Sequence, residues 1–229
     1  MRCDTAIVLC GGIGSRFREI SKLPKILSKF QNGKFIDYII EYLKMHNIKN
    51  IVFSVGYKHD YIIKYIKEKE YLDVSFIIED KPLNTGGAIL NVQRKLLLSK
   101  NQRYLVLNGD TYWSESLPDL LFDNLDKSII LCAHSVLIND RYGNLILKNN
   151  KLEISRGSIS NKIYNSLVYS GIASIPASFL NEQIKPLSVE ELFTSWNEFA
   201  DFKIHTLNSE VIDFGTTEGY EALQSLNVL

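Results

Sequence analysis

The sequence predicts an α/β protein: a three-layer, Rossmann-like sandwich with a mostly parallel central sheet and a smaller, β-rich second half. Short apolar runs alternate with longer helical patterns early in the chain, and short strand-like runs joined by turns are frequent later. The 229 residues include 45% apolar and 23% charged side chains, the usual mixture of a globular protein with a full core. We expect one domain over residues 1–229, with halves of about 1–128 and 129–229.

The first half shows the alternation that βαβ units require. Runs of strand length and apolar character lie at residues 6–9, 51–55, 74–78 and 104–107. Apolar residues recur at helical spacing in the segments between them, at residues 35–45, 61–66 and 85–98. Strands that alternate with helices form parallel sheets with right-handed crossovers. We therefore expect the first half to contain a largely parallel sheet covered by helices.

The second half has shorter and more closely spaced elements. Strands are expected at residues 129–133, 145–147, 152–154, 169–175 and 203–207. A helix is expected at residues 189–199, and a last helix begins near Thr217. The polar segment Lys148-Asn149-Asn150-Lys151 predicts a hairpin turn between two of the strands.

Charge and cysteine content exclude several classes of protein. The 26 basic and 26 acidic side chains give a net charge of zero, which argues against bulk electrostatic binding to nucleic acid or to an anionic membrane. The 3 cysteines have no CxxC spacing, and no apolar run approaches membrane-spanning length. The 4 histidines share neither metal-site nor catalytic-triad spacing, so a surface position or core packing is the interpretation we favour for each. We expect a cytoplasmic protein.

A glycine-rich loop directly follows the first strand. Its candidate phosphate-binding residues are Leu9, Gly11, Gly12, Gly14, Ser15 and Arg16. Glycine allows a tight turn and lets backbone N–H groups approach a phosphate, while an arginine can hold phosphate oxygens in a fork. The loop lacks the GK[ST] ending of a P-loop and the glycine spacing of a dinucleotide fold. Pro24 restricts the backbone next to Lys25. The Lys25 ammonium is therefore a second candidate cation for the same phosphates.

Two aspartates end expected strands and are candidate ligands of Mg²⁺. Asp110 follows the strand at residues 104–107, at the edge where open α/β sheets place their ligand crevice. Asp213 precedes the last helix, where a bare aspartate is more often a helix cap. One or two carboxylates together with phosphate oxygens are a common magnesium site.

The ordered motifs of the chain resemble those of the sugar-1-phosphate nucleotidyltransferases. The signature GGxGTRx…PK of that family is matched by Gly11-Gly12-Ile13-Gly14-Ser15-Arg16 and Pro24-Lys25, with Ser15 in place of threonine. Further matches follow in the family's order, at residues 79–88, 108–110, 169–171 and 213–220. The resemblance spans residues 5–220.

The resemblance implies a reaction and a set of roles. A nucleoside triphosphate and a sugar 1-phosphate would give a nucleoside-diphosphate sugar and pyrophosphate. Arg16 would bind the leaving pyrophosphate, Lys25 the α-phosphate, and Asp110 and Asp213 a Mg²⁺ ion. The second half would form a sugar-binding lobe. No nucleic acid or membrane partner is expected, and a homodimer is left open.

The base pocket favours GTP. Its candidate residues are Glu79, Pro82, Asn84 and Thr85, and Gly109 is a further candidate for nucleotide binding. The ionised carboxylate of Glu79 can accept two parallel hydrogen bonds from the adjacent N1–H and N2–H₂ donors of guanine, whereas uracil and thymine offer one donor. Asn84 stands where the family usually has glycine.

The sugar side departs most from the family. Candidate residues for the sugar phosphate are Gly143, Asn161, Lys162 and Gly171, with Arg156 as a rival phosphate ligand. Asn161 replaces the glutamate that normally precedes the lysine. Within the family, the chain is most similar to short guanylyltransferases of bacterial surface-polysaccharide synthesis that act on D-glycero-D-manno-heptose 1-phosphate. The alternatives are cytidylyl, uridylyl or thymidylyl transfer to another sugar 1-phosphate, and a non-catalytic nucleotide-binding homologue.

Overall fold

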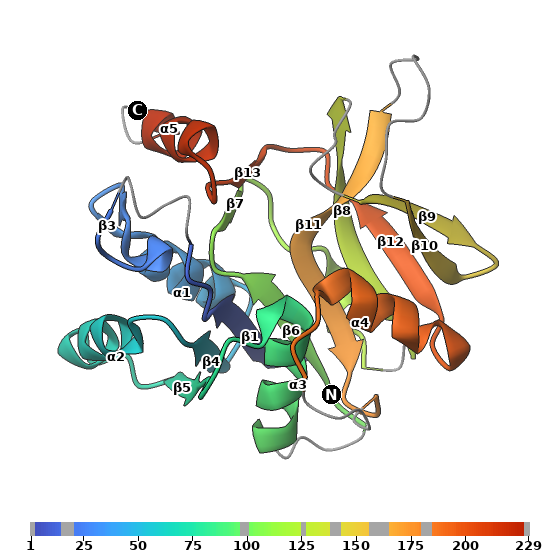
Figure 1. Ribbon diagram of the computed structural model, residues 1–229, viewed down its shortest axis with the longest axis horizontal. Helices are drawn as coiled ribbons and strands as arrows, with labels where there is room; N and C mark the ends of the chain where they lie inside the picture. The colour runs from blue at the N-terminus through green and yellow to red at the C-terminus, as the bar shows by residue number, and fades with distance from the viewer. Residues whose placement is uncertain are drawn as a thin grey trace.

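The computed structural model describes residues 3–14, 21–96, 101–124, 127–137, 143–155, 165–179 and 185–226. Within this part of the chain, a sheet of 9 strands has the order β10-β9-β11-β6-β1-β4-β5, with β8 beside β11 and β12 beside β8 (Figure 1). The strands are β1 (Thr5–Cys10), β4 (Asn50–Val55), β5 (Val74–Ile78), β6 (Arg103–Asn108), β8 (Ile129–Leu137), β9 (Asn144–Lys148), β10 (Lys151–Ser155), β11 (Asn165–Pro176) and β12 (Phe202–Thr206).

Helices cover both faces of the sheet (Figure 1). They are α1 (Phe35–Met45), α2 (His59–Glu68), α3 (Asn84–Leu96), α4 (Val189–Ser195) and α5 (Thr217–Ser225). Successive side chains of a strand point to opposite faces, so Ala6 and Val8 pack with the apolar residues of α1, α2 and α5, while Ile7 packs with those of α3 and α4. The result is the three-layer arrangement that the sequence predicts.

The α/β fold class is confirmed, and the sheet is mixed. Strands β6, β1, β4 and β5 run parallel, as the βαβ pattern predicts. Strand β11 joins this set antiparallel to β6 and also pairs antiparallel with β8 and β9. The strands of the second half therefore extend the central sheet. Among the described residues, no helix is both long enough and apolar enough to span a bilayer.

Apart from the strand expected to end at Asp213, the short strand pairs are elements that the sequence pattern does not predict. They are β2 (Lys29–Phe30) with β3 (Gly33–Lys34), and β7 (Thr111–Trp113) with β13 (Val211–Asp213). Three short 3₁₀ helices are also present in the described part, η2 (Lys25–Leu27), η3 (Asp119–Phe122) and η4 (Trp196–Glu198). Elements of two to four residues are too short to show a period in the sequence.

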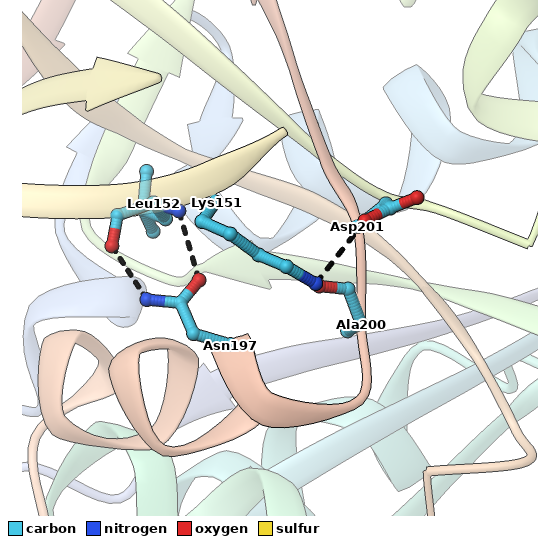
Figure 2. A network of polar contacts seen from close by, with 5 residues as sticks. All are labelled: Lys151, Leu152, Asn197, Ala200 and Asp201. Atoms are coloured by element: carbon cyan, nitrogen blue, oxygen red, sulfur yellow. Dashed lines mark hydrogen bonds and ion pairs between the residues drawn. The ribbon is translucent and has the colours of Figure 1, made fainter. Parts of the chain in front are cut away.

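The predicted hairpin between β9 and β10 is confirmed, and hydrogen bonds from the segment that follows α4 hold it in place. Asn149 and Asn150 both have positive φ, at 51° and 61°, which asparagine tolerates better than most residues. Figure 2 shows how the side chain of Asn197 holds this hairpin: it accepts the N–H of Leu152 at 2.8 Å and donates to the carbonyl of Leu152 at 2.7 Å. Beside it, Lys151 Nζ lies 2.9 Å from the carbonyl oxygen of Ala200.

Candidate active site

A cavity of about 580 Å³ opens where β1 and β6 end. Most of the predicted nucleotide-binding residues line it: Leu9, Gly11, Gly12, Gly14, Lys25, Glu79, Pro82, Asn84, Thr85, Gly109, Asp110 and Asp213. Its position at the carboxyl ends of parallel strands is where open α/β sheets bind ligands. The volume suits a small-molecule ligand.

The glycine loop runs along this cavity from Glu79 to Lys25. The carbonyl of Gly11 accepts the N–H of Tyr57 at 3.1 Å, which fixes the start of the loop. A Cβ on Gly11 would lie 2.2 Å from Glu79 Oε1, and Gly14 has φ +59° with Lys25 Cε 2.9 Å from its absent Cβ. Any other residue at either position would collide with a predicted functional side chain.

Lys25 is held by a short 3₁₀ turn. Helix η2 begins at Lys25, after Pro24, and buries Ile26 and Leu27 beneath it. The Lys25 ammonium lies 2.8 Å from Asp110 Oδ2, and the two side chains keep 21% and 31% of their surface exposed. The structure therefore brings together Lys25 and Asp110, two of the site residues that the sequence predicts.

The β7–β13 pair brings the two aspartates together across about a hundred residues of sequence. Thr111 is paired with Asp213 in this ladder, and the N–H of Phe214 donates to the carbonyl of Asp110 at 3.0 Å. A Cβ placed on Gly215 would lie 2.9 Å from Asp213 Oδ1, 3.0 Å from Lys25 Nζ and 3.4 Å from Asp110 Oδ2. Only glycine leaves this space open, and both carboxylates border it. Thr216, and not Asp213, caps α5.

This geometry fits a hard divalent cation. Among the described residues, no group of three or more acidic, histidine or cysteine side chains converges, so the site offers two carboxylates. Magnesium is commonly bound by one or two carboxylates, with phosphate oxygens and water completing its shell. The donor set therefore suits a metal that arrives with a phosphate ligand.

Ser54 is a contact of Glu79 that sequence reasoning missed. Its hydroxyl is buried and donates to Glu79 Oε1 at 2.9 Å, while the backbone N–H of Leu83 donates to the same carboxylate. Burial raises the pKa of Glu79, and these two hydrogen bonds partly offset it. A single polar residue inside the apolar run 51–55 was the signal available in the sequence. The carboxylate is thus oriented by the chain before any ligand binds.

Asn84 adopts the backbone conformation that explains its place in the motif. Its φ is +56°, in the left-handed region, where glycine is favoured and asparagine is the best tolerated alternative. The substitution of glycine by asparagine therefore preserves the turn that begins α3.

We expect Asn84→Gly to leave the free energy of unfolding nearly unchanged, and Asn84→Val to lower it by about 1–2 kcal/mol, because a β-branched side chain is strained at positive φ. Urea unfolding of both variants measures this difference. If Asn84→Gly and Asn84→Val lowered the free energy of unfolding equally, the positive φ of residue 84 would not be the reason for asparagine at this position.

The glycines of α3 allow the segment of residues 185–188 to pack closely against the start of this helix, beside the candidate base pocket. A Cβ on Gly86 would lie 2.4 Å from the carbonyl oxygen of Ser188, and the N–H of Gly86 donates to the carbonyl of Leu187 at 3.0 Å. Leu187 in turn donates to the carbonyl of Leu83 at 3.1 Å. Ser188 caps α4 and lines the main cavity, a role that the sequence did not indicate.

A second cavity of about 350 Å³ adjoins the first and shares Thr85, Asn108 and Asp213 with it. The predicted sugar-side residues Gly143 and Gly171 line it. Its other lining residues are Thr111, His134, Val136, Leu145, Tyr169, Ser170, Val189, Glu190 and Val211. The two cavities thus meet at the aspartate site.

His134 is a histidine of the second cavity. It is half-buried in the wall of the second cavity, and its Nδ1 has no hydrogen-bond partner among the described residues. Burial lowers the pKa of His134, and the nearby Asp213 partly offsets this. No local spacing in the sequence places β8 beside this cavity.

A smaller basic cavity of about 200 Å³ lies beyond the glycine loop. Lys22, Lys25 and Lys58 line it together with Gly12 and Gly14. The Lys58 ammonium donates to the carbonyl of Lys22. Lys58 is a cation near the loop that the sequence motifs did not indicate.

Some sequence predictions fall on residues outside the described part of the chain. They are Ser15 and Arg16 of the loop, and Arg156, Asn161 and Lys162 on the sugar side.

Comparison with known proteins places the chain in a family. Residues 5–155 match the family model described as Nucleotidyl transferase. The D-glycero-alpha-D-manno-heptose 1-phosphate guanylyltransferase of Campylobacter jejuni is 33% identical over 94% of this chain and 96% of that protein. The crystal structure of HddC from Yersinia pseudotuberculosis, also solved in complex with GMP-PN, is 27% identical with a TM-score of 0.77, covering 97% of this chain and 99% of that chain.

A fold-level likeness extends further. A putative glucose-1-phosphate thymidylyltransferase from Bacillus anthracis has a TM-score of 0.81 at 20% identity over 97% of this chain and 95% of that chain, which shows the same α/β fold. The family match covers more than half of the chain, and the Campylobacter relative exceeds 30% identity over nearly all of it. The chain is therefore a member of the nucleotidyl transferase family.

Proposed function

We propose that this protein is a guanylyltransferase that converts GTP and D-glycero-D-manno-heptose 1-phosphate into GDP-heptose and pyrophosphate. The names of the Campylobacter relative and of a guanylyltransferase from Aneurinibacillus thermoaerophilus, 28% identical over 96% of this chain, support this substrate pair. The observation that carries the proposal is the carboxylate of Glu79, oriented by Ser54 and Leu83 in the wall of the nucleotide cavity.

Glu79 would recognise guanine through its Watson–Crick edge. An ionised carboxylate accepts hydrogen bonds from N1–H and N2–H₂ in parallel, and charged hydrogen bonds contribute more than neutral ones. Ser54 and Leu83 hold the acid without bonding to the base, so little side-chain freedom is lost on binding. Burial makes the ionised acid costly in the free protein, and the donors of guanine relieve that cost.

The reaction needs positioning and charge neutralisation and no covalent enzyme intermediate. An oxygen of the sugar phosphate attacks the α-phosphorus of GTP and forms a new P–O bond. The bond from the α-phosphorus to the bridging oxygen breaks on the opposite side, and pyrophosphate carries away that electron pair. A phosphate dianion is already a nucleophile, so no general base is required. Lys25 would neutralise charge on the α-phosphate, and Arg16 would hold the leaving pyrophosphate.

Asp110 and Asp213 would hold a Mg²⁺ ion in the space that Gly215 leaves open. A bound Mg²⁺ supplies Lewis-acid neutralisation of the phosphate oxygens. On the acceptor side, Lys162 would hold the sugar phosphate, and Asn161, Gly143 and Gly171 would border the sugar. Gly12, whose absent Cβ would meet nothing within 4 Å, leaves room for a phosphate to approach the backbone.

The role of Glu79 is tested with GTP and inosine triphosphate, which lacks only the 2-amino group. We expect the wild type to prefer GTP by about 10- to 100-fold in kcat/KM, the discrimination that one charged hydrogen bond provides. In Glu79→Gln the amide NH₂ faces the guanine 2-amino group, so this preference should collapse. Steady-state pyrophosphate release measures both ratios.

The matched control is Asp80→Asn, which removes a neighbouring exposed charge and should keep the preference for GTP. A wild type that uses both nucleotides equally would contradict the recognition of guanine by Glu79. Because burial raises the pKa of Glu79, the preference should decline at a higher pH than for an ordinary glutamate as the solution is acidified. The Glu79→Gln variant should show no such decline.

A further inference from the structure

Some residues that line the second cavity have buried polar side-chain atoms with no hydrogen-bond partner in the described part of the chain. Tyr169 Oη, Ser170 Oγ and His134 Nδ1 are buried and have no hydrogen-bond partner among the described residues. Asn108 Oδ1, in the wall shared with the nucleotide cavity, is a fourth. Buried polar atoms are nearly always paired, so a group of unpaired ones around one cavity points to a ligand that pairs them.

A β-bulge places Tyr169 and Ser170 at this cavity. The register between β11 and β8 shifts between Tyr169 and Ala173, where Gly171 has φ +77°. The indole N–H of Trp113 donates to the carbonyl of Ser170 at 2.7 Å and holds the bulge in place. Bulges of this kind redirect side chains next to active sites. Ser170 is 2% exposed, so its hydroxyl has no alternative partner in bulk water.

The chemistry of the unpaired atoms indicates a hydroxyl-rich ligand. Tyrosine and serine hydroxyls both donate and accept, and the asparagine oxygen accepts. Sugar hydroxyls also donate and accept, so a polyol can satisfy all of these atoms together. An apolar or quaternary-ammonium acceptor would leave them unpaired. The cavity also adjoins the aspartate site through Asp213, which is where the sugar of an attacking sugar phosphate must lie.

We propose that Tyr169 and Ser170 bind hydroxyl groups of the acceptor sugar and are specificity-determining residues of the transfer reaction. This inference rests on the proposed function and deepens it. It assigns sugar recognition to the bulge of β11, separately from the residues that hold the sugar phosphate.

Two isosteric variants test the inference, Tyr169→Phe and Ser170→Ala. Each removes one hydroxyl, and Phe at residue 169 keeps the edge contact with Phe193, whose ring centroid is 5.8 Å away. We expect KM for heptose 1-phosphate to rise about 3- to 10-fold in each variant, as for loss of a neutral hydrogen bond, with KM for GTP unchanged. Thermal stability should not fall, because the lost hydroxyl has no hydrogen-bond partner among the residues that the structure describes.

Tyr104→Phe is the matched control. Tyr104 Oη is also buried and has no hydrogen-bond partner within the described ranges, but Tyr104 lines none of the three cavities described above. Removal of the Tyr104 hydroxyl should change neither the KM for heptose 1-phosphate nor the KM for GTP. Unchanged KM for the sugar phosphate in both test variants, or a change no larger than that of Tyr104→Phe, would overturn the inference.

Deoxy analogues of the sugar phosphate add a test of specificity. An analogue that lacks the hydroxyl bound by Tyr169 should lose affinity for the wild type and none for Tyr169→Phe, because ligand and protein then lack the same hydrogen bond. Strictly additive losses for every deoxy analogue would contradict direct contact.

Calorimetric binding separates this inference from the proposed function. Heptose 1-phosphate is titrated into protein saturated with guanosine 5′-(α,β-methylene)triphosphate, whose α–β bridge resists cleavage. If the wild type binds the sugar phosphate but releases no pyrophosphate from GTP, the proposed function fails, and weaker binding by the variants still supports the inference. Absence of sugar-phosphate binding to the wild type would overturn the inference itself.

Discussion

Replacing Lys25 with methionine is expected to lower kcat by about 10²–10³, the scale of losing one charge-stabilising donor in a preorganised site. Methionine keeps much of the length of the side chain and removes the cation. The Lys25 ammonium lies 2.8 Å from Asp110 Oδ2 and borders the space beside Gly215. Among the described residues, Lys25 is the lysine whose ammonium forms an ion pair with Asp110. Without it, the α-phosphate would lose its nearest cation. Single-turnover formation of the sugar nucleotide measures the chemical step directly.

Lys29→Met is the control for Lys25→Met. Lys29 lies on the neighbouring β2 strand with an exposed side chain, so its replacement should leave kcat within about twofold, as for a surface substitution. If Lys25→Met raised KM for GTP while kcat stayed the same, Lys25 would serve ground-state binding and not the transition state.

Replacing Arg103 with methionine is expected to lower the free energy of unfolding by about 3–5 kcal/mol, as for removal of one partner from a buried polar network. Arg103 is 2% exposed in β6. Its guanidinium donates to Ser174 Oγ at 2.7 Å and to the carbonyl oxygens of Asp123, Ser128 and Ser174 at 3.0, 2.9 and 3.0 Å. Methionine has no N–H donor, so it would remove these four hydrogen bonds from a largely buried network. Such a loss is a large share of the roughly 5–15 kcal/mol that stabilises a typical domain.

Arg103 also matters for the site, because it joins β6, which leads into Asp110, to β11, which carries Ser170 and Gly171. Arg94→Met, on the exposed side of α3, is the matched control and should change stability by no more than about 0.5 kcal/mol. Urea unfolding of both variants decides the comparison. Equal stability of the two variants would show that the buried guanidinium contributes nothing net to folding.

The elements with a strong hydrophobic period were predictable from the sequence. Residues 35–45 and 74–78 form α1 and β5 within the predicted limits, because one apolar face in the helix and a mostly apolar run of strand length each leave a clear pattern. The hairpin at Asn149 and Asn150 was predictable because few residues other than glycine accept positive φ as readily.

The candidate site was predictable where motifs carry it and unpredictable where distant strands meet. Asp110 and Asp213 were chosen from motifs, but the β7–β13 ladder that joins them is only three residues long and leaves no period. Ser54 and His134 are polar residues in apolar strands, and only the packing of the sheet shows that Ser54 contacts Glu79 and that His134 lines a cavity. Ser170 lies at a bulge of β11, whose position depends on the pairing of β11 with β8.

The central claim, guanylyl transfer to a heptose 1-phosphate, is tested most directly by pyrophosphate release in the presence of Mg²⁺. GTP, CTP, UTP, ATP and dTTP are each offered with heptose, mannose and glucose 1-phosphates. We predict the highest kcat/KM for GTP with the heptose phosphate. Faster turnover with another nucleotide would contradict the assignment of Glu79, and absence of pyrophosphate release with every pair would contradict guanylyl transfer to these sugars.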